Sequence, residues 1–398
     1  MFSLTALLLC PTVAALSWDI LHPGADPDHG KDMLQIVRDK KYPIEEHHIE
    51  TEDGYVLTIF RIPHGLGSNQ VGAPVLVQHA LLCSSFDWVN NPANESLAFV
   101  LADAGFDVWL GNNRGGPWGR SHTSRETDSE EFWDFTIDHM ALFDLPAHVD
   151  YVLRATGQPS LSYIGHSEGT IQAFAGFSRN STLSSKVNLF VAFAPMAYAH
   201  HQTSLVFGAL AYLDVSQLFE MFGMHEFLPQ GGVLNKVAPG ICGPLGALCA
   251  NSIELFCGKS HDLNATRMPI YLAQTPAGTS VKNMAHWAQL IKHDRFGMWD
   301  FGSKEDNMKH YGEEGPPGYK LSDLTVPTAL YTGGLDILSN PRDVQKLIYE
   351  LPTTTLIHHK VIDSYAHLDF SWGQDAARLL YPDVIAQLKA YRGDDFQV

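Results

Sequence analysis

The stretch Leu161-Ser-Tyr-Ile-Gly-His-Ser-Glu-Gly-Thr170 decides the fold, because it joins a strand to a helix through a sharp turn. Residues 161–165 form a short, mostly apolar run typical of a buried strand, and residues 170–178 have helical spacing. Between them lies a G-x-S-x-G motif, whose two glycines let the chain turn sharply and let strand and helix approach closely. The setting predicts that Ser167 projects from the sheet as a nucleophile, whereas the alternative is an idle surface turn.

Strand-like and helical segments alternate on both sides of this turn. Residues 95–104 and 138–156 have helical spacing. The predicted strands are a hairpin arm over residues 50–65, single strands at 73–79, 161–165, 189–194, 328–332 and 356–362, and a strand that passes into a loop within residues 106–116. Strands that alternate with helices predict an α/β fold with a mostly parallel central sheet covered on both faces.

The alternation stops between about residues 200 and 322, where the chain is rich in Phe, Leu, Met, Gly and Pro. This segment shows no clear strand pattern, so we expect a mostly helical cap inserted into the sheet domain. A chain of 398 residues is long enough for such an arrangement. The predicted organisation is a signal peptide (1–17), the first part of the core (18–199), the cap (200–321) and the second part of the core (322–398).

A serine nucleophile requires a base, and the base requires a carboxylate that orients it. When the serine lies on a strand–turn–helix of this type, the orienting Asp or Glu follows it along the chain, and the histidine base comes after that acid. Asp336 follows a predicted strand and two glycines, and His367 follows the predicted strand 356–362. Both residues therefore leave the carboxyl ends of strands, where open α/β sheets place their sites. The rival candidates are Asp363 and Asp369 for the acid, and His358 and His359 for the base.

Backbone N–H groups near the nucleophile are expected to stabilise an oxyanion. One donor is the N–H of Glu168, directly after the nucleophile, and the other is the N–H of Leu81, in the loop after the strand that ends near Gln78. His79 and His166 flank this site in the sequence. As single histidines we expect them to have structural roles.

The composition excludes several classes of function. The chain has 26 basic and 44 acidic residues, giving a net charge of −18 that argues against nucleic acid as a partner. No phosphate-binding loop, dinucleotide fingerprint or H-E-x-x-H metal motif is present. We therefore expect neither a cofactor nor a metal.

The N-terminal residues 1–17 are typical of a secretory signal peptide, and no other stretch is long and apolar enough to cross a bilayer. Three sequons, at Asn94, Asn180 and Asn264, predict glycosylation. These features predict entry into the secretory pathway and a secreted or lysosomal protein.

Three cysteines, Cys242, Cys249 and Cys257, cluster in the predicted cap. Together with the signal peptide, the cluster suggests one local disulfide in an oxidising compartment, although the spacing does not define the pairing. A zinc site is the rival interpretation, but the spacing lacks the close cysteine pairs that zinc usually requires.

Many ordered blocks of this chain resemble the acid lipase family, of the gastric and lysosomal type, in the α/β-hydrolase fold. The blocks are residues 50–65, HALL (79–82), WLGNNRG (109–115), EFWDFTIDHMALFDLPAHVDYV (131–152), GHSEGT (165–170), FAP (193–195), 276–289, GGLDIL (333–338) and HLDF (367–370). The resemblance implies hydrolysis of triacylglycerols or steryl esters at a lipid–water interface, favoured in acid.

The resemblance also implies roles for individual residues. It implies a triad of Ser167, Asp336 and His367, and an oxyanion hole formed by Leu81 and Glu168. Within the cap it implies a lid and a disulfide between Cys242 and Cys249, which would leave Cys257 free. The apolar segment 205–222 is the predicted lid, with the alternative that it packs against the core.

Two residues depart from the family pattern near the site. Ala80 replaces a glycine of the family, so we expect an altered loop if that position needs a positive φ. Glu168 replaces a glutamine, and an ionised carboxylate beside an oxyanion would repel it. Either protonation of Glu168 or a side chain turned away from the site would remove this conflict.

Two other functions are compatible with the same scaffold. An acyltransferase would use an alcohol in place of water in the second half of the reaction, and a non-catalytic homologue would only bind lipid. The presence of Ser167, Asp336 and His367 favours an enzyme over the binding protein. The oligomeric state is not indicated by the sequence.

Overall fold

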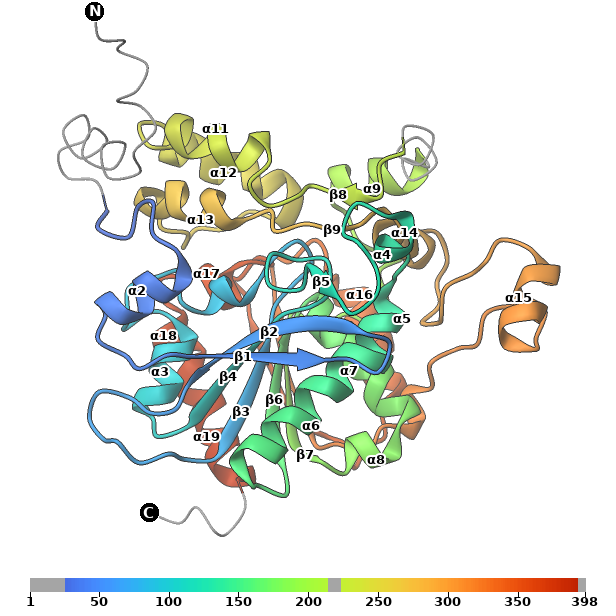
Figure 1. Ribbon diagram of the computed structural model, residues 1–398, viewed down its shortest axis with the longest axis horizontal. Coiled ribbons are helices and arrows are strands. Elements are labelled where there is room, and N and C mark those ends of the chain that lie inside the picture. Colours follow the sequence, from blue (N-terminus) through green and yellow to red (C-terminus); the bar gives the residue numbers. More distant parts are fainter. Residues whose placement is uncertain (1–25, 214–222, 393–398) are drawn as a thin grey trace, which may run out of the picture.

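The computed structural model describes residues 26–213 and 223–392, so the predicted signal peptide lies outside the described residues. Nine strands form one sheet, helices cover both of its faces, and a further group of helices lies above its upper edge (Figure 1). The predicted mostly parallel sheet with flanking helices is confirmed. The predicted domain boundaries stay a prediction.

The sheet has the strand order β1-β2-β4-β3-β6-β7-β10-β11, and β5 pairs with β2. The strands are β1 (Glu45–Glu50), β2 (Tyr55–Ile62), β3 (Pro74–Gln78), β4 (Asp107–Gly111), β5 (Ser121–His122), β6 (Leu161–His166), β7 (Val187–Phe193), β10 (Thr328–Gly333) and β11 (Leu356–Ile362). All pairs from β4 to β11 are parallel, whereas β1, β2 and β5 form an antiparallel arm. The carboxyl ends of the parallel strands therefore meet along one edge.

Two apolar layers cover the sheet, one on each face. Side chains alternate between them, so Tyr163 of β6 belongs to one core and Ile164 to the other. One face packs against α6 (Leu145–Thr156), α7 (Glu168–Arg179) and α16 (Pro341–Glu350), and the other against α2 (Met33–Asp39), α3 (Leu97–Asp103) and α19 (Tyr381–Tyr391). Burial on both faces explains why these strands are continuous apolar runs in the sequence.

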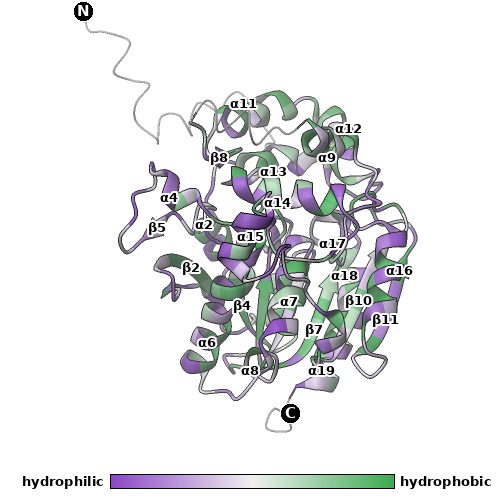
Figure 2. Cartoon of the chain, turned by 90° about the vertical axis from the view of Figure 1, so that its right-hand side faces the viewer, coloured by the Kyte–Doolittle hydropathy of each residue, from purple (hydrophilic) through white to green (hydrophobic). Residues whose placement is uncertain are grey.

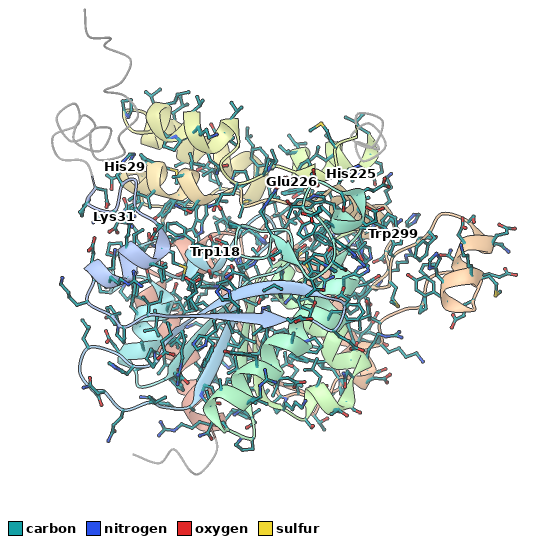
Figure 3. The ribbon with its side chains drawn as sticks, viewed as in Figure 1. His29, Lys31, Trp118, His225, Glu226 and Trp299 are labelled. Atoms are coloured by element: carbon teal, nitrogen blue, oxygen red, sulfur yellow. A yellow bond between two sulfur atoms is a disulfide. The ribbon has the colours of Figure 1, made fainter. Side chains whose placement is uncertain are left out.

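The cap is mostly helical, with one short exception. Its helices are α9 (Leu205–Tyr212), α11 (Val233–Cys242), α12 (Gly246–Cys257), α13 (Met268–Gln274), α14 (Val281–Lys292) and α15 (Lys304–Tyr311). A two-residue ladder between β8 (Glu226–Phe227) and β9 (Thr279–Ser280) was not predicted, because two residues are too few for a strand pattern. Part of the predicted lid segment lies outside the described residues. Helix α15 extends away from the body on an arm, with Trp299 labelled near the start of that arm (Figure 3).

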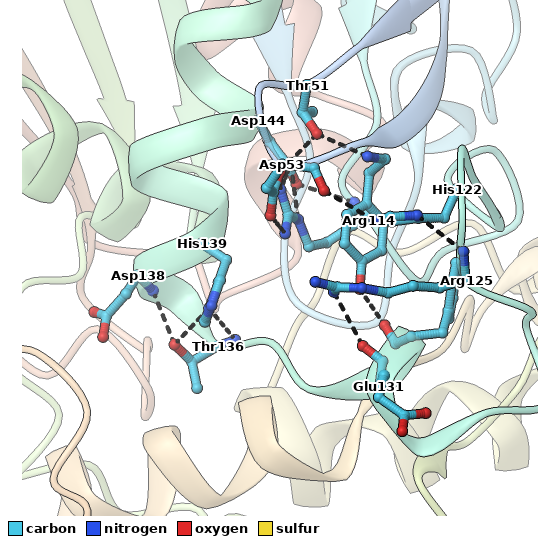
Figure 4. A network of polar contacts seen from close by, with 12 residues as sticks. Thr51, Asp53, Arg114, His122, Arg125, Glu131, Thr136, Asp138, His139 and Asp144 are labelled. Carbon is cyan, nitrogen blue, oxygen red and sulfur yellow. Dashed lines mark hydrogen bonds and ion pairs between the residues drawn. The ribbon is translucent and has the colours of Figure 1, made fainter. Parts of the chain in front are cut away.

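A buried ion-pair network holds the loop after β4 under the cap. The guanidinium of Arg114 is bound by the carboxylates of Asp53 and Asp144 at distances of 2.6–2.9 Å (Figure 4). The helix predicted over residues 138–156 is interrupted by a π-helical turn at Met140–Asp144, which ends on one of these carboxylates. The network thus fixes the loop to two distant segments, and removal of Arg114 would leave the buried carboxylate of Asp144 without its cation.

Candidate active site

Ser167 lies between β6 and α7 in a strained conformation, with φ 52° and ψ −110°. A Cβ atom at Gly165 would lie 2.6 Å from the carbonyl oxygen of Gly169, and one at Gly169 would lie 2.7 Å from that of Gln78. Both glycines are therefore required by close packing around the turn. The N–H of Ser167 donates to the carbonyl oxygen of Phe193 at 3.1 Å, which fixes the turn to β7.

The structure brings Ser167, His367 and Asp336 together at the carboxyl edge of the sheet. The Oγ of Ser167 lies 2.8 Å from Nε2 of His367. Nδ1 of the same imidazole lies 2.9 and 3.0 Å from the two carboxylate oxygens of Asp336. The backbone N–H groups of Leu338 and Ser339 donate to Oδ1 of Asp336, each at 2.9 Å, and so hold the carboxylate in place. The three side chains are buried and form one continuous hydrogen-bonded chain.

The rival acids and bases make other contacts. Asp363 is exposed, and Asp369 binds the hydroxyl of Ser260 and the N–H of Ala366. The strand histidines face elsewhere, because His358 pairs with Asp383 at 3.0 Å and His359 with Thr332 at 3.0 Å.

The loop that carries Leu81 is ordered by His79. Nε2 of His79 accepts the backbone N–H of Asn113 at 3.1 Å, so Nδ1 carries the proton and donates to the carbonyl oxygen of Ala80 at 2.8 Å. Burial lowers the pKa of His79 to about 4, which keeps this tautomer neutral. Ala80 does not have a positive φ, so the condition for a strained alanine is not met; in this loop Leu82 adopts the left-handed conformation, with φ 60°.

The side chain of Glu168 is turned towards the cap. Its Oε1 accepts the indole N–H of Trp287 and the amide N–H of Asn283, both at 2.8 Å, and both donors come from α14. Burial raises the pKa of the Glu168 carboxyl, while the two N–H donors act in the opposite direction. Of the two ways to avoid conflict with an oxyanion, the turned side chain is observed, and burial favours the protonated form as well.

A small, mostly apolar cavity of about 80 Å³ lies in front of Ser167. Leu81 and Ser167 both line this cavity. The role of the Leu81 N–H as an oxyanion donor stays a prediction. The apolar part of the wall includes Met196, Phe207, Ile291, Leu338 and Leu368. Such a surface suits hydrocarbon, because it offers few polar partners apart from the serine and the histidine.

The cysteines of the cap are divided as the resemblance implied. Cys242 and Cys249 form a disulfide that joins the end of α11 to α12, with 5.7 Å between their Cα atoms. Cys257 and Cys83 carry free thiols, and both line the cavity.

Glycosylation of the three sequon asparagines stays a prediction. Asn94 and Asn180 are exposed, whereas Asn264 is half-buried. Among the residues that the structure describes, no group of three or more His, Cys, Asp or Glu side chains could hold a metal ion.

Three residues of the site have roles that the sequence did not reveal. Asn283 and Trp287 belong to a family-like block of the cap, but they lie more than 110 residues from their partner Glu168, so no spacing indicated the contact. His166 was expected to be structural, and its imidazole contacts the backbone of His367.

Comparison with known proteins gives the class of this fold. A family model described as "alpha/beta hydrolase fold" matches residues 73–374, and one described as "Partial alpha/beta-hydrolase lipase region" matches residues 33–92. Among solved structures, a soluble variant of monoglyceride lipase from Saccharomyces cerevisiae superimposes with a TM-score of 0.56, over 88% of this chain and 96% of that one. Its sequence identity is 16%, so this likeness concerns the fold alone. The fold is that of the α/β-hydrolases.

Curated relatives narrow the class. Human gastric triacylglycerol lipase is 41% identical over 374 residues, covering 92% of this chain and 93% of the relative. Human lysosomal acid lipase/cholesteryl ester hydrolase is 41% identical over 375 residues, covering 93% of each. This chain therefore belongs to the acid lipase family of the α/β-hydrolase fold.

Proposed function

We propose that this chain hydrolyses the carboxylic ester bonds of neutral lipids, triacylglycerols or steryl esters, with Ser167 as its nucleophile. The observation that carries the proposal is the unbroken hydrogen-bonded chain from Ser167 through His367 to Asp336, at the base of an apolar cavity. Membership of a lipase family supports the same chemistry, because the named relatives are lipases and cholesteryl ester hydrolases.

In the first half of the proposed reaction, Nε2 of His367 takes the proton of Ser167 as Oγ attacks the ester carbonyl. Asp336 holds Nδ1–H of the imidazole and stabilises the positive charge that forms on it. The protonated His367 then gives its proton to the leaving alcohol, and the acyl group stays on Ser167.

In the second half, water takes the place of the alcohol. His367 removes a proton from the water as the water attacks the acyl carbonyl. The protonated His367 then returns this proton to Oγ of Ser167 as the bond from Oγ to the acyl carbon breaks and the fatty acid leaves. The oxyanion that forms in each half would be stabilised by the backbone N–H groups of Glu168 and Leu81. The N-terminal end of α7 adds a favourable dipole at the same point.

The shape of the cavity favours a substrate that enters after the cap has moved. A cavity of about 80 Å³ is far smaller than the roughly 300–1,000 Å³ of typical ligand pockets, so a glyceride requires a wider opening. The cap contributes Phe207 and Trp287 to the cavity wall, so a movement of the cap would widen the cavity.

No helix of the described residues is long and apolar enough to span a bilayer.

The outer surface of the cap supports docking at a lipid–water interface. Helices α9, α11 and α12 carry many hydrophobic residues (Figure 2). Those with large exposed fractions are Leu205, Tyr212, Val233, Leu234, Val237, Ile241, Leu245, Leu248, Leu255 and Phe256. Scattered apolar side chains are normal on a surface, but nine on these three helices, with Leu245 directly before α12, suit contact with acyl chains.

We further propose that the protein is secreted or lysosomal and works best in acid. The predicted signal peptide, the three sequons and the disulfide of the cap fit the secretory route. Two buried acids should make the folded state more stable in acid than at neutral pH. Burial raises the pKa of Asp87 to about 7 and that of Asp369 to about 6.

The test is turnover by the purified protein at pH 5 and pH 7 on emulsified triolein, cholesteryl oleate and a short soluble ester. The proposal expects free fatty acid from triolein, cholesteryl oleate or both, at a higher rate at pH 5. Hydrolysis of only the short ester would contradict the lipid assignment. With cholesterol added, accumulation of new steryl ester instead of fatty acid would favour an acyltransferase.

A further inference from the structure

The backbone of His367 is held from two directions, although this residue lies in a loop after β11. Its N–H donates to the carbonyl oxygen of Cys257 in the cap at 3.1 Å. Its own carbonyl oxygen lies 2.8 Å from Nε2 of His166. Because a carbonyl oxygen can only accept, Nε2 of His166 must carry the proton in this pair.

The imidazole of His166 has no other polar contact that would explain it. The residue ends β6, directly before Ser167, and its side chain is fully buried. Within the described part of the chain, Nδ1 of His166 has no hydrogen-bond partner. A buried, unpaired nitrogen lowers stability, so an apolar ring of similar size would suit the core better. Folding alone therefore does not account for an imidazole here.

We propose that His166 is a positioning residue, which fixes the backbone of His367 so that its imidazole stays aligned with Oγ of Ser167. The proposal rests on the proposed roles of Ser167 and His367. His166 and Ser167 are neighbours in the chain, so their contacts with His367 close a ring between nucleophile and base that does not pass through Asp336. A displacement of about 1 Å in such a site can lower the rate about 100-fold.

The environment of His166 also allows His367 to become positively charged during catalysis. The two imidazole rings lie 5.1 Å apart, centre to centre. Burial, together with the nearby charge of a protonated His367, lowers the pKa of His166 to about 3. His166 is thus neutral at pH 5 and does not repel the imidazolium that forms on His367 during catalysis.

Two substitutions separate the hydrogen bond from the packing. His166→Phe keeps a ring but removes the donor, whereas His166→Gln keeps an N–H close to the position of Nε2. The measurement is the rate of phosphonylation of Ser167 by an alkyl p-nitrophenyl phosphonate, followed by release of p-nitrophenol, together with kcat and KM on a soluble ester. In this reaction the serine oxygen bonds to phosphorus, p-nitrophenolate leaves, and His367 accepts the serine proton.

We expect His166→Phe to lower both the phosphonylation rate and kcat by about 30- to 100-fold, with KM within about twofold of the wild type. We expect His166→Gln to retain most of the wild-type rate. The control for burial is His148→Phe, because His148 is a fully buried histidine of α6 whose ring nitrogens have no hydrogen-bond partner among the described residues. That control should leave the rate per folded molecule unchanged.

Phosphonylation of His166→Phe at the wild-type rate would overturn the inference, as would a His166→Gln variant that is as slow as His166→Phe. Should His166→Phe fail to fold, His166→Asn replaces it, since its shorter amide does not reach the carbonyl oxygen of His367. Failure of the wild-type protein to be phosphonylated at Ser167 would instead contradict the proposed function. The two failures are therefore distinguishable.

Discussion

The indole N–H of Trp287 donates to the carboxyl of Glu168 across 2.8 Å, and this bond joins a cap helix to the residue beside the nucleophile. Trp287 also lines the cavity in front of Ser167. One buried carboxyl thus connects the turn that carries the nucleophile with a wall of the substrate cavity. Its charge state should affect catalysis, because the backbone N–H of the same residue is the proposed oxyanion donor.

Glu168→Gln should broaden activity towards neutral pH. Burial raises the pKa of the Glu168 carboxyl, so this group is protonated in acid and becomes ionised as the pH rises. The turned side chain lessens the repulsion between an ionised Glu168 and the oxyanion but does not abolish it, because charges interact more strongly in a buried site of low dielectric constant. A glutamine can accept hydrogen bonds from the same two N–H groups without carrying a charge. We expect kcat/KM of the variant to match the wild type at pH 5 and exceed it several-fold at pH 7.5.

The matched control for this variant is Glu95→Gln, at a partly buried carboxyl outside the cavity whose pKa is also raised by burial. This control should leave the pH profile of hydrolysis unchanged. A profile of Glu168→Gln identical to that of the wild type would contradict a role for the charge of Glu168.

Asp336→Asn should reduce kcat by roughly 10⁴-fold, because the amide no longer holds the productive tautomer of His367. Asp363→Asn is the matched control, since Asp363 is a rival candidate from the sequence and is exposed. Steady-state hydrolysis of a soluble ester at pH 5 measures both. Loss of activity in Asp363→Asn, with Asp336→Asn active, would reverse the assignment of the acid.

Removing apolar side chains from the cap should weaken action at an interface without affecting the chemistry. Val233 and Leu248 are 79% and 61% exposed on α11 and α12. We expect the double variant Val233→Ser/Leu248→Ser to lose severalfold activity on emulsified triolein and to keep wild-type activity on a soluble short ester. Leu66→Ser, at a comparably exposed leucine of a loop on the core, should change neither rate. Equal losses on both substrates would argue against an interfacial role.

Asp87→Asn should stabilise the protein at high pH only. Asp87 is 1% exposed, and burial raises its pKa to about 7, although the Cys83 thiol and the Trp372 indole lie close. A folded-state pKa above the unfolded value means that Asp87 favours folding below about pH 4, and that this contribution is lost as the pH rises to about 7. We expect the melting temperatures of variant and wild type to be similar at pH 4, and that of the variant to be higher at pH 8. The same difference at both pH values would show that ionisation of Asp87 is not the cause.

The sheet and the elbow could be predicted from the sequence because each rests on a local pattern. The strands buried on both faces are continuous apolar runs, and the G-x-S-x-G turn requires its glycines for reasons of packing within a few residues. Asp336 and His367 could be placed because parallel strands end at a common edge, and the structure has both after β10 and β11.

Other features depend on contacts between distant segments, which no local pattern reveals. The bonds from Asn283 and Trp287 to Glu168, and from His166 to the backbone of His367, join residues separated by between 115 and 201 positions. The β8–β9 ladder has two residues in each strand, too few for a periodic signal. The loop at residues 79–82 is tied to Asn113 through His79, so the identity of residue 80 alone did not show that the positive φ falls at Leu82.

The most direct test of the central claim is hydrolysis of triolein at pH 5 by Ser167→Ala, compared with the wild type at equal folded concentration. We expect a loss of roughly 10⁴-fold or more, because the nucleophile is removed while the cavity remains. Hydrolysis by Ser167→Ala at a rate close to that of the wild type would contradict it.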